Sequence, residues 1–317
     1  MPQWIGEDEI RAQLPMSQLI DLMAQTLAAF SSGRVEQPVR SVIEAGPAAF
    51  FASMPALIKT TPALGTKLVT VFGSNTEKGL PTHLATIVLL DPATGALLAV
   101  MDGRYITEAR TAAVSAVSAR LLARPDASVL ALIGSGVQAH SHWEALPLVR
   151  EFREIRCWSP TRANLDRFVS EHHSVRAAAT AEQAITGADV IALLTSSTVP
   201  VIKNHWVKDG ACVISVGACR PNQREMDPDL VACARLIVDS RAAALQESGD
   251  IVMGIGEGRF GPDHITAELG ELVINPTIAQ QSDERVTIFK SLGLACEDVA
   301  AAQLVWNAAA ASWRRSA

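Results

Sequence analysis

The sequence lacks several features that would assign it to a common class of protein. Aromatic residues make up only 5% of its 317 residues, and there is a single tyrosine. The five cysteines are scattered and form no C-x-x-C pair, which argues against a disulfide framework or a zinc finger and predicts reduced thiols in a cytoplasmic protein. No apolar run reaches the roughly 18 residues that a membrane helix needs.

The charge balance excludes further classes. A net charge of −6 disfavours nucleic acid as the main partner. The first residues, MPQWIGEDEIRAQL, contain no basic head followed by an apolar run, so no signal peptide is expected. Hydrophobic residues make up 49% of the chain and charged residues 19%, which predicts a folded protein with a large buried core rather than a disordered one.

No combination of histidine, cysteine and carboxylate has the spacing of a metal site. His140 and His142 are two residues apart on a predicted helix and therefore lie on different faces. The neighbouring His172 and His173 are typical of a solvated helix end. No metal is expected, and no Ser/His/Asp triad can be assigned.

The first part of the chain predicts a helix followed by an antiparallel sheet. Residues 15–32 carry apolar side chains at helical spacing, and Gly33 follows as a stop signal. Short apolar runs separated by glycine and proline then predict five strands, PVRSVIEA, AFFASMPA, TKLVTVF, LATIVLLD and ALLAVMD. A long Ala-rich helix is expected from about residue 107 to residue 122.

After Ser128, strands and helices alternate. The predicted strands are VLALI, IRCWS, VIALL, CVISVG and RLIVDS. This alternation predicts a parallel sheet of the doubly wound Rossmann type. The segment from TIFK to the last residue is expected to be one Ala-rich helix that either caps this domain or returns to the first. The predicted fold class is α/β, a Rossmann nucleotide domain with an additional α+β domain.

The stretch SVLALIGSGVQAHSHWEAL has the order strand, glycine turn and helix that a dinucleotide fingerprint requires. In such a loop the first glycine permits a tight turn, the second lets the backbone approach a pyrophosphate, and the third position is small. Gly134, Gly136 and Ala139 take these places, with Val137 and Gln138 between them. A nicotinamide dinucleotide is the expected cofactor, and a coincidental glycine pair is the alternative.

The residues after the second Rossmann strand bear on the choice between NAD and NADP. NAD-binding domains usually carry Asp or Glu about 20 residues beyond the glycine loop. Here Ser159, Pro160, Thr161 and Arg162 follow the strand, and two hydroxyls with a guanidinium suit a 2′-phosphate. NADP(H) is therefore favoured over NAD(H). The alternative is that Thr161 only caps the next helix and Arg162 is solvated.

A series of motifs resembles the ornithine cyclodeaminase/mu-crystallin family, most closely its mu-crystallin (ketimine reductase) branch. In chain order they are QPVR, MPA, TKLVT, VMDG, TEARTAAVSAVSARLL, GSGVQA, ADVI, VGACRP, VDSRAAALQESGDI, AELGEL and IFKSLG. The resemblance implies a homodimer in which residues 1–115 with 295–317 form the substrate-binding and dimerisation domain. Residues 116–294 would then form the NAD(P)-binding Rossmann domain. Members include cyclodeaminases, ketimine reductases and alanine dehydrogenases, so the family alone does not fix the reaction.

Three cations stand on separate predicted elements of an apolar region: Arg40 in QPVR, Lys67 in TKLVT and Arg110 in EARTAA. From the residues alone they are more typical of exposed strand ends. The resemblance implies instead that they bind the α-carboxylate of a 2-imino or 2-amino acid, because buried cations need an anion and arginine can bind a carboxylate with two parallel bonds. Thr111, beside Arg110, is a candidate for contacts with the cofactor phosphates.

His83 in LPTHLAT falls between two predicted strands and matches a histidine of the mu-crystallin branch. The resemblance makes it a candidate for donating a proton or a hydrogen bond to the substrate. A surface position in a turn is the alternative.

Two positions distinguish a lyase from a reductase. Cyclodeaminases of the family carry an Asp and a Glu where this chain has Cys219 and Ala52. A thiol near its ordinary pKa is mostly protonated at neutral pH and cannot supply the fixed charge of a carboxylate. The uncharged Cys219 followed by R-P-x-x-R-E at residues 220–225 is similar to the ketimine reductases instead.

The expected activity is NAD(P)H-dependent reduction of a cyclic imine carboxylate, such as pyrroline- or piperideine-2-carboxylate, to a cyclic amino acid. Catalysis then requires mainly that the imine carbon lie about 3–3.5 Å from the nicotinamide. Cys219 is kept as a candidate contact for the substrate. The alternatives are an ornithine cyclodeaminase-type lyase, an amino-acid dehydrogenase, and a non-catalytic small-ligand binder of the mu-crystallin type. The sequence leaves the ring size and the proton donor open.

Overall fold

The computed structural model describes residues 2–47, 49–279 and 285–316, except for the side chains of 313–316. The chain divides into two compact units. Unit 1 comprises Met1–Arg110 with Gly293–Ala317, and unit 2 comprises Thr111–Leu292. The boundaries therefore lie at 110/111 and 292/293, where the sequence placed them at 115/116 and 294/295.

Unit 1 contains a seven-stranded sheet. Its strands are β1 (Gln3–Ile5), β2 (Val35–Glu36), β3 (Ser41–Gly46), β4 (Ala49–Ile58), β5 (Ala63–Phe72), β6 (His83–Leu90) and β7 (Leu97–Asp102). The five strands predicted from the sequence are β3 to β7, and neighbouring members pair antiparallel as predicted. The short β1, which was not predicted, joins β7 in parallel, and the unpredicted β2 pairs with β4.

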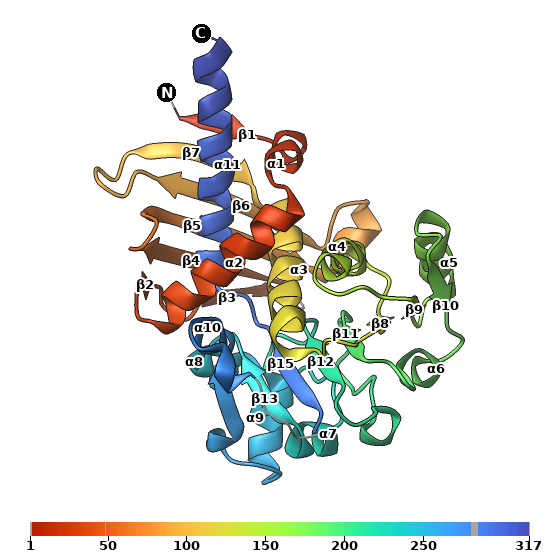
Figure 1. The fold of residues 1–317 in the computed structure, drawn as a ribbon. Coiled ribbons are helices and arrows are strands. Elements are labelled where there is room, and N and C mark those ends of the chain that lie inside the picture. The colour runs from red at the N-terminus through yellow and green to blue at the C-terminus, as the bar shows by residue number, and fades with distance from the viewer. Residues whose placement is uncertain (1, 48, 280–284, 317) are drawn as a thin grey trace. The chain divides into compact units, whose positions relative to one another are not determined.

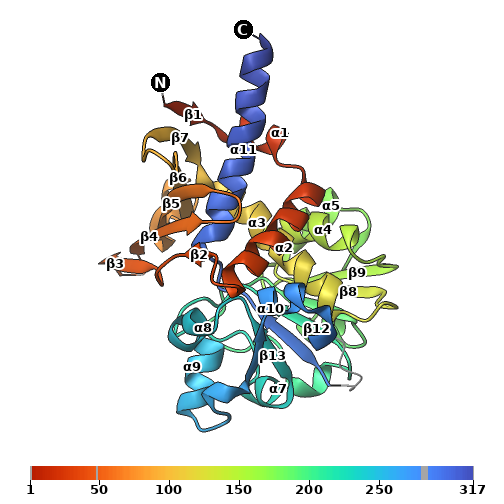
Figure 2. The same ribbon diagram turned by 60° about the vertical axis from the view of Figure 1, so that its left-hand side comes forward.

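Helices cover one face of this sheet. They are α1 (Glu7–Gln13), α2 (Met16–Ser31), α11 (Ala295–Ser316) and the first part of α3 (Gly103–Leu122). The terminal helix α11 packs on β4, β5 and β6 and also contacts α2 (Figures 1 and 2). It therefore returns to the first unit, one of the two arrangements that the sequence left open. Along β5, every second residue from Ala63 to Val69 is buried, which is the strand period.

Unit 2 contains an eight-stranded sheet in which all neighbouring strands are parallel. Its strands are β8 (Val129–Ile133), β9 (Glu154–Trp158), β10 (Val175–Ala177), β11 (Val190–Leu193), β12 (Cys212–Ser215), β13 (Arg235–Val238), β14 (Ile265–Glu268) and β15 (Thr287–Lys290). Its helices, besides the second part of α3, are α4 (Val137–Ala145), α5 (Arg162–Glu171), α6 (Ala181–Ile185), α7 (Pro228–Cys233), α8 (Arg241–Glu247), α9 (Gly249–Gly256) and α10 (Leu269–Ile274).

The strand order of this sheet confirms the predicted Rossmann fold. The order is β10-β9-β8-β11-β12-β15-β13-β14, so the direction of winding reverses between β8 and β11. Ligands of open α/β sheets bind beyond the carboxyl ends of the strands at such a switch point. The glycine loop follows β8 and therefore starts at this place.

The prediction of one helix from residue 287 to the end was wrong in its first part. Thr287–Lys290 is strand β15, which lies between β12 and β13, and the helix begins at Ala295. Four residues with two apolar positions give too short a pattern to separate a buried strand from a helix. No helix among the described residues combines the length and the apolarity that crossing a membrane requires.

Candidate functional site

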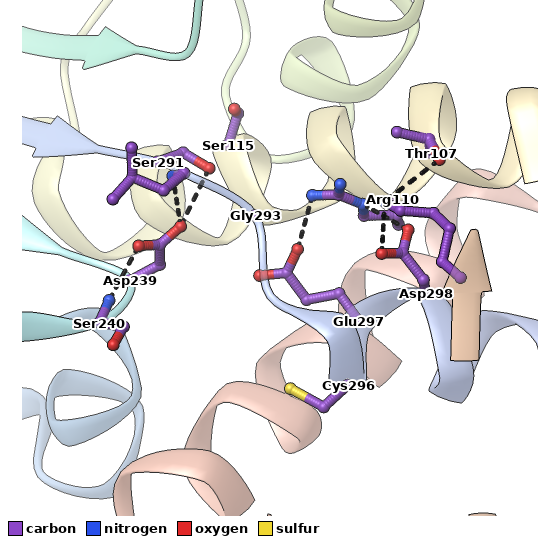
Figure 3. A network of polar contacts seen from close by, with 12 residues as sticks. Thr107, Arg110, Ser115, Asp239, Ser240, Ser291, Gly293, Cys296, Glu297 and Asp298 are labelled. Atoms are coloured by element: carbon purple, nitrogen blue, oxygen red, sulfur yellow. Dashed lines mark hydrogen bonds and ion pairs between the residues drawn. The ribbon is translucent and has the colours of Figure 1, made fainter. Parts of the chain in front are cut away.

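A buried cluster of opposite charges lies in unit 1, at the start of α11. The Nζ of Lys67, on β5, lies 2.6 Å from Oδ2 of Asp298. Arg110, on α3, donates from Nε to the other oxygen of Asp298 at 3.0 Å, and from Nη1 to Glu297 at 2.7 Å. All four side chains are buried, with Glu297 and Asp298 fully inaccessible. Figure 3 shows Arg110 directed from its helix toward both carboxylates.

Backbone and hydroxyl groups complete this cluster. Arg40 donates from Nη2 to the carbonyl oxygen of Gly293 at 3.0 Å, and Lys67 lies 3.5 Å from the hydroxyl of Thr107. Gly293 has a φ of +82°, and a Cβ there would lie 2.6 Å from Nη1 of Arg110. Only glycine fits between the left-handed backbone and the guanidinium. The three cations that the sequence singled out are thus brought together, from a loop, a strand and a helix.

The charges of the cluster shift its pKa values. Burial lowers the pKa of Lys67 to about 8, and the nearby Arg110 lowers it as well, against the attraction of Asp298. Burial by itself would raise the pKa of Asp298, but Arg110 and Lys67 outweigh it, so that the pKa lies below its ordinary value. Asp298 therefore stays ionised at neutral pH.

An anion from solution was expected to balance these cations, but the chain itself supplies most of the balance. The chain supplies two carboxylates of its own, Glu297 and Asp298, in the first turn of α11. Counting Arg40, Lys67 and Arg110 against them leaves a formal excess of one positive charge in this group of five. The desolvation of buried ions costs free energy that their mutual attraction rarely offsets completely. Such a cluster is therefore better explained by ligand binding than by a contribution to the stability of the fold. It can take one further carboxylate.

His83 begins β6 and shares a face of the sheet with Lys67. His83 pairs with Val71 of β5, so the two side chains lie on the same face of the sheet. Side chains of a strand alternate between faces, so Lys67, four residues before Val71, lies on this face too. Burial lowers the pKa of His83 to about 4, with a further contribution from the charges of Lys67 and Arg110. The imidazole is therefore neutral at pH 7. It can donate a hydrogen bond from its N–H but holds no extra proton to give away.

In unit 2, the glycine loop has the local geometry that the fingerprint predicts. Gly134 has a φ of +118°, and a Cβ there would lie 2.6 Å from the carbonyl oxygen of Leu194. Gly136 precedes α4 in extended conformation, and a Cβ there would meet no atom of the described chain within 4 Å. Ala139 is fully buried where the small third residue belongs. The first glycine is thus required by the protein, whereas the second is required by nothing in the described chain and leaves space for a ligand.

Two polar atoms in this loop support the same fit. The hydroxyl oxygen of Ser135 and the amide oxygen of Gln138 are buried and make no hydrogen bond within the described chain. Buried polar atoms are nearly always paired, so a ligand or water is expected beside them. With the N-terminus of α4, whose N–H groups attract anions, this is the arrangement that a pyrophosphate needs.

Among the residues after β9, Thr161 and Arg162 are exposed to solvent. Thr161 stands at the N-cap of α5, but its side chain makes no capping bond. Arg162 is exposed and pairs with Asp166 one turn later at 2.8 Å. Ser159 is half-buried, and Thr111, the remaining candidate for cofactor contacts, is buried within α3. The hydroxyl of Thr161 is therefore not used as a cap, whereas Arg162 is exposed, so the alternative that the sequence left open holds for Arg162 only.

A fully buried carboxylate, which the sequence did not single out as a site residue, joins two strand ends of unit 2. Glu225 accepts hydrogen bonds from the N–H and the hydroxyl of Thr195 after β11, at 2.8 and 2.7 Å. It also accepts from the N–H groups of Gly217 and Ala218 after β12, at 2.8 and 3.0 Å. Glu225 thus fixes two loops at the carboxyl edge of the sheet. The next residue along the second loop is Cys219.

A buried lysine and a second carboxylate accompany Glu225. Lys290, on β15, donates to the hydroxyl of Ser215 at 3.0 Å and lies 3.4 Å from Oδ2 of Asp250. Asp250 accepts from the N–H of Glu225 at 3.0 Å. Burial raises the pKa of Glu225, partly offset by the charge of Lys290. The signal for this network was the Arg-Glu pair at 224–225, which the sequence analysis considered only as part of the family resemblance.

The two positions that distinguish lyase from reductase hold no carboxylate. Cys219 is half-buried and forms no disulfide, and Ala52 is buried on β4. Neither can act as a carboxylate acid or base.

The histidines of α4 diverge as predicted. His142 is fully buried, with Nδ1 2.7 Å from the carbonyl oxygen of Gln138 and Nε2 2.8 Å from the hydroxyl of Ser115. Burial lowers its pKa to about 4, so it is a neutral core residue. His140 faces α5 instead, and its Nδ1 lies 2.8 Å from Nε2 of His172. His172 and His173 do stand at a helix end and His173 is exposed as expected, but His172 is half-buried against aromatic rings.

Comparison with known proteins gives consistent matches over nearly the whole chain. The family model described as the ornithine cyclodeaminase/mu-crystallin family matches residues 5–312. A ketimine reductase mu-crystallin of Rattus norvegicus is 44% identical over 312 residues, which are 96% of this chain and 97% of that protein.

Two solved structures share the fold closely. One is the Δ1-pyrroline-2-carboxylate reductase of Thermococcus litoralis in complex with NADH and L-proline, with a TM-score of 0.95, 32% identity and 98% of each chain covered. The other is an archaeal alanine dehydrogenase dimer with bound NAD, with a TM-score of 0.93, 31% identity, and 98% of this chain and 97% of that chain covered.

Proposed function

The chain belongs to the ornithine cyclodeaminase/mu-crystallin family, and on that premise we propose that it reduces a cyclic imine carboxylate to the cyclic amino acid with NAD(P)H. As an enzyme it is an NAD(P)-dependent oxidoreductase that acts on C=N bonds, as the relatives named above indicate. The observation that favours reduction over deamination is the pair Cys219 and Ala52. Neither supplies a carboxylate for acid–base work on a substrate amine.

We assign substrate binding to the cluster in unit 1. Arg110 and Lys67 are held in place by Glu297 and Asp298, so their charges are fixed before a ligand arrives. Preorganised charges bind an anion without the cost of ordering long side chains. Together with Arg40 they would hold the α-carboxylate and thereby orient the imine carbon.

Reduction of the C=N bond adds one hydride and one proton. The dinucleotide, when bound, supplies the hydride. An imine nitrogen that is already protonated carries its own proton into the reaction, so the chain need only orient and shield it. His83, neutral at pH 7, is suited to donating a hydrogen bond near the substrate rather than a proton.

For the cofactor we propose NADP(H) on unit 2. The glycine loop at Gly134 and Gly136 would bind the pyrophosphate. The 2′-phosphate would be bound by the hydroxyl of Thr161, which makes no capping bond, together with Ser159 and the exposed Arg162. The test is the ratio of kcat/KM for NADPH to that for NADH. Changing Arg162 to alanine should lower this ratio about tenfold. A hydrogen bond to a charged group contributes about 1.5–3 kcal/mol, and an exposed one such as this is expected near or below the lower value. A ratio that stays the same would contradict the assignment.

We also propose that the chain acts as a cytoplasmic homodimer on small imino or amino acids, without nucleic acid as a partner. Support for the dimer comes from the alanine dehydrogenase dimer and from Val42 and Ile43, apolar residues exposed on β3. The five free cysteines are consistent with a reducing compartment. Light scattering on the full chain would measure the mass, and a monomer at micromolar concentration would contradict the dimer.

The activity itself can be tested directly. The purified chain is mixed with NADPH or NADH and either Δ1-pyrroline-2-carboxylate or Δ1-piperideine-2-carboxylate, and oxidation of the cofactor and formation of the cyclic amino acid are measured. In parallel, ornithine with NAD is assayed for ammonia release. Imine reduction without ammonia release is expected. Ammonia release without imine reduction would overturn the proposal.

A second function is favoured by the similarity to the alanine dehydrogenase. The same cluster would hold the carboxylate of a linear 2-oxo acid, which ammonia converts to an imine before reduction. Pyruvate with ammonium and NAD(P)H tests it, and turnover faster than with either cyclic imine would make it the main activity.

A further inference from the structure

Three side chains with metal-ligating atoms meet between α4 and α5 in unit 2. His140 lies on α4, Glu171 is the last residue of α5, and His172 caps that helix. One ligand atom from each lies within 4.8 Å of the others. The sequence did not reveal the group, because 32 residues separate the two histidines.

The distances suit a divalent cation. Nδ1 of His140 lies 2.8 Å from Nε2 of His172 and 3.7 Å from Oε2 of Glu171. Two nitrogens each about 2.0–2.1 Å from one metal ion, at a right angle, are about 2.9 Å apart, and at the tetrahedral angle about 3.4 Å. Small rotations of the rings would therefore bring both nitrogens to one ion, with the carboxylate as the third ligand.

The chemistry of the three groups points to the same class of ion. Two imidazoles with one carboxylate are ligands of Zn²⁺ and of its neighbours Cu²⁺ and Ni²⁺. The side chains of His140 and Glu171 are 39% and 51% exposed, so water can reach the ion and complete its coordination.

The surroundings hold the ligands ready. The ring of His172 lies 4.1 Å from that of Trp143 and 4.6 Å from that of Phe168, and the ring of His140 lies 4.8 Å from Phe168. Packed rings lose little conformational entropy when an ion binds.

We propose that His140, Glu171 and His172 bind one divalent transition-metal ion of the Zn²⁺ class, which links α4 to α5. The bond between the two histidines, in which one nitrogen must donate a proton to the other, is replaced by two metal–nitrogen bonds. The ring that donates in this bond moves its proton to its other nitrogen, so both rings can coordinate without loss of a proton. The bound ion joins the two helices and thereby stabilises the folded chain. This site is independent of the proposed reductase activity.

The test is a titration of tag-free full-length protein, stripped with a chelator, with zinc chloride. A Cys233→Ser background removes the exposed thiol as a competing ligand. One ion per chain is expected, and at a hundredfold excess over its dissociation constant it should raise Tm by about 5 °C. With Cu²⁺ in place of Zn²⁺, the electron spin resonance spectrum should show two coupled nitrogens.

Three variants decide between this site and binding elsewhere. His140→Gln and Glu171→Gln, which keep the size of the side chain, should each weaken Zn²⁺ at least tenfold. The matched control is His173→Gln, next to the site but exposed and outside the group, and it should bind as the parent does. The proposal is overturned if the parent takes up no stoichiometric ion, or if His140→Gln binds as tightly as the parent.

Discussion

Each unit of this protein buries a small group of ionic side chains, and the two groups differ in the sign of their excess charge. In unit 1, Arg40, Lys67 and Arg110 exceed the carboxylates Glu297 and Asp298 by one positive charge. In unit 2, Glu225 and Asp250 exceed Lys290 by one negative charge when both are ionised.

The sign of the excess charge indicates that the group in unit 1, and not the group in unit 2, can bind an anionic ligand. Four donors from two loops already occupy Glu225, so its charge is spread over backbone N–H groups and serves to hold those loops. In the unit 1 group the three cations exceed the two carboxylates, so the group can accept one more anion. The buried charges therefore have different roles in the two units. In unit 2 they hold two loops in position, and in unit 1 they are suited to binding an anion.

The strongest way to break this contrast is to remove a cation from unit 1. Arg110→Met should lower kcat/KM for the imino acid about 100- to 1000-fold, because a lost buried charge partner costs about 2–5 kcal/mol. The control is Arg104→Met on the same helix, where the arginine pairs with Glu7 near the surface, and it should change kcat/KM less than about twofold. Steady-state kinetics measures both. If Arg110→Met changed only the KM for the dinucleotide, Arg110 would serve the cofactor instead.

The role of Glu225 can be tested by Glu225→Gln. The amide keeps the size but presents N–H groups toward backbone donors, so stability should fall by about 2 kcal/mol and kcat by roughly tenfold. Glu151→Gln, which removes an exposed carboxylate of the same unit, is the matched control and should leave both unchanged. Thermal unfolding and kinetics are compared. A Glu225→Gln variant with unchanged Tm and kcat would refute positioning by this group.

The two loop glycines should separate folding from binding. Gly134→Ala should lower Tm by several degrees, because the new Cβ meets Leu194 at a positive φ. Gly136→Ala should leave Tm within about 2 °C but raise the KM for the dinucleotide about tenfold, because the new methyl occupies space that the described chain leaves open. If Gly136→Ala destabilised the fold without affecting the cofactor, the pyrophosphate assignment would be wrong.

The smallest expected effect concerns pH. The pKa of Lys67 is about 8, so its side chain loses the ammonium charge above that pH. Half a pH unit above the pKa about a quarter of the molecules keep the charge, so kcat/KM for the imino acid should be about fourfold below its value at neutral pH. Lys67→Arg should abolish this fall, because a guanidinium does not deprotonate. A fall that persists in the variant would come from the substrate's own imine.

The same lowered pKa makes stability move the opposite way. The unfolded chain keeps the proton of Lys67 up to its ordinary pKa of 10.5, whereas the folded chain loses it near 8. Between these values the unfolded state binds more protons, so the contribution of Lys67 to stability rises with pH. Comparing unfolding of the parent and Lys67→Arg across this range isolates the contribution.

Much of the architecture followed from local patterns. Strands β3 to β7, the alternation after Ser128 and the loop at Gly134 and Gly136 were all predicted, because strand period, helix period and glycine turns are written in neighbouring residues. The exceptions were short. Strands β1, β2, β10, β14 and β15 have two to four residues each, and none of them has more than two consecutive apolar residues. The equally short β11, β12 and β13 were predicted because each contains a continuous apolar run.

The candidate site was predictable only in part. The three cations of unit 1 were found through their motifs, but their partners Glu297 and Asp298 were not, although an acidic pair at the start of an Ala-rich helix was a visible signal. Glu225 was noticed only as part of a motif. The meeting of His140 with His172 had no signal at all.

The sequence by itself determined the two-part plan, the strands, the dinucleotide turn and the family, because each depends on residues close together in the chain or on motifs in order. The tertiary structure alone decided which charges meet. Arg110 is separated from Glu297 by 187 residues and from Asp298 by 188, and no local pattern encodes such a pairing. It arises only when α11 packs on the sheet that carries Lys67, where exclusion of water forces every buried charge to find a partner.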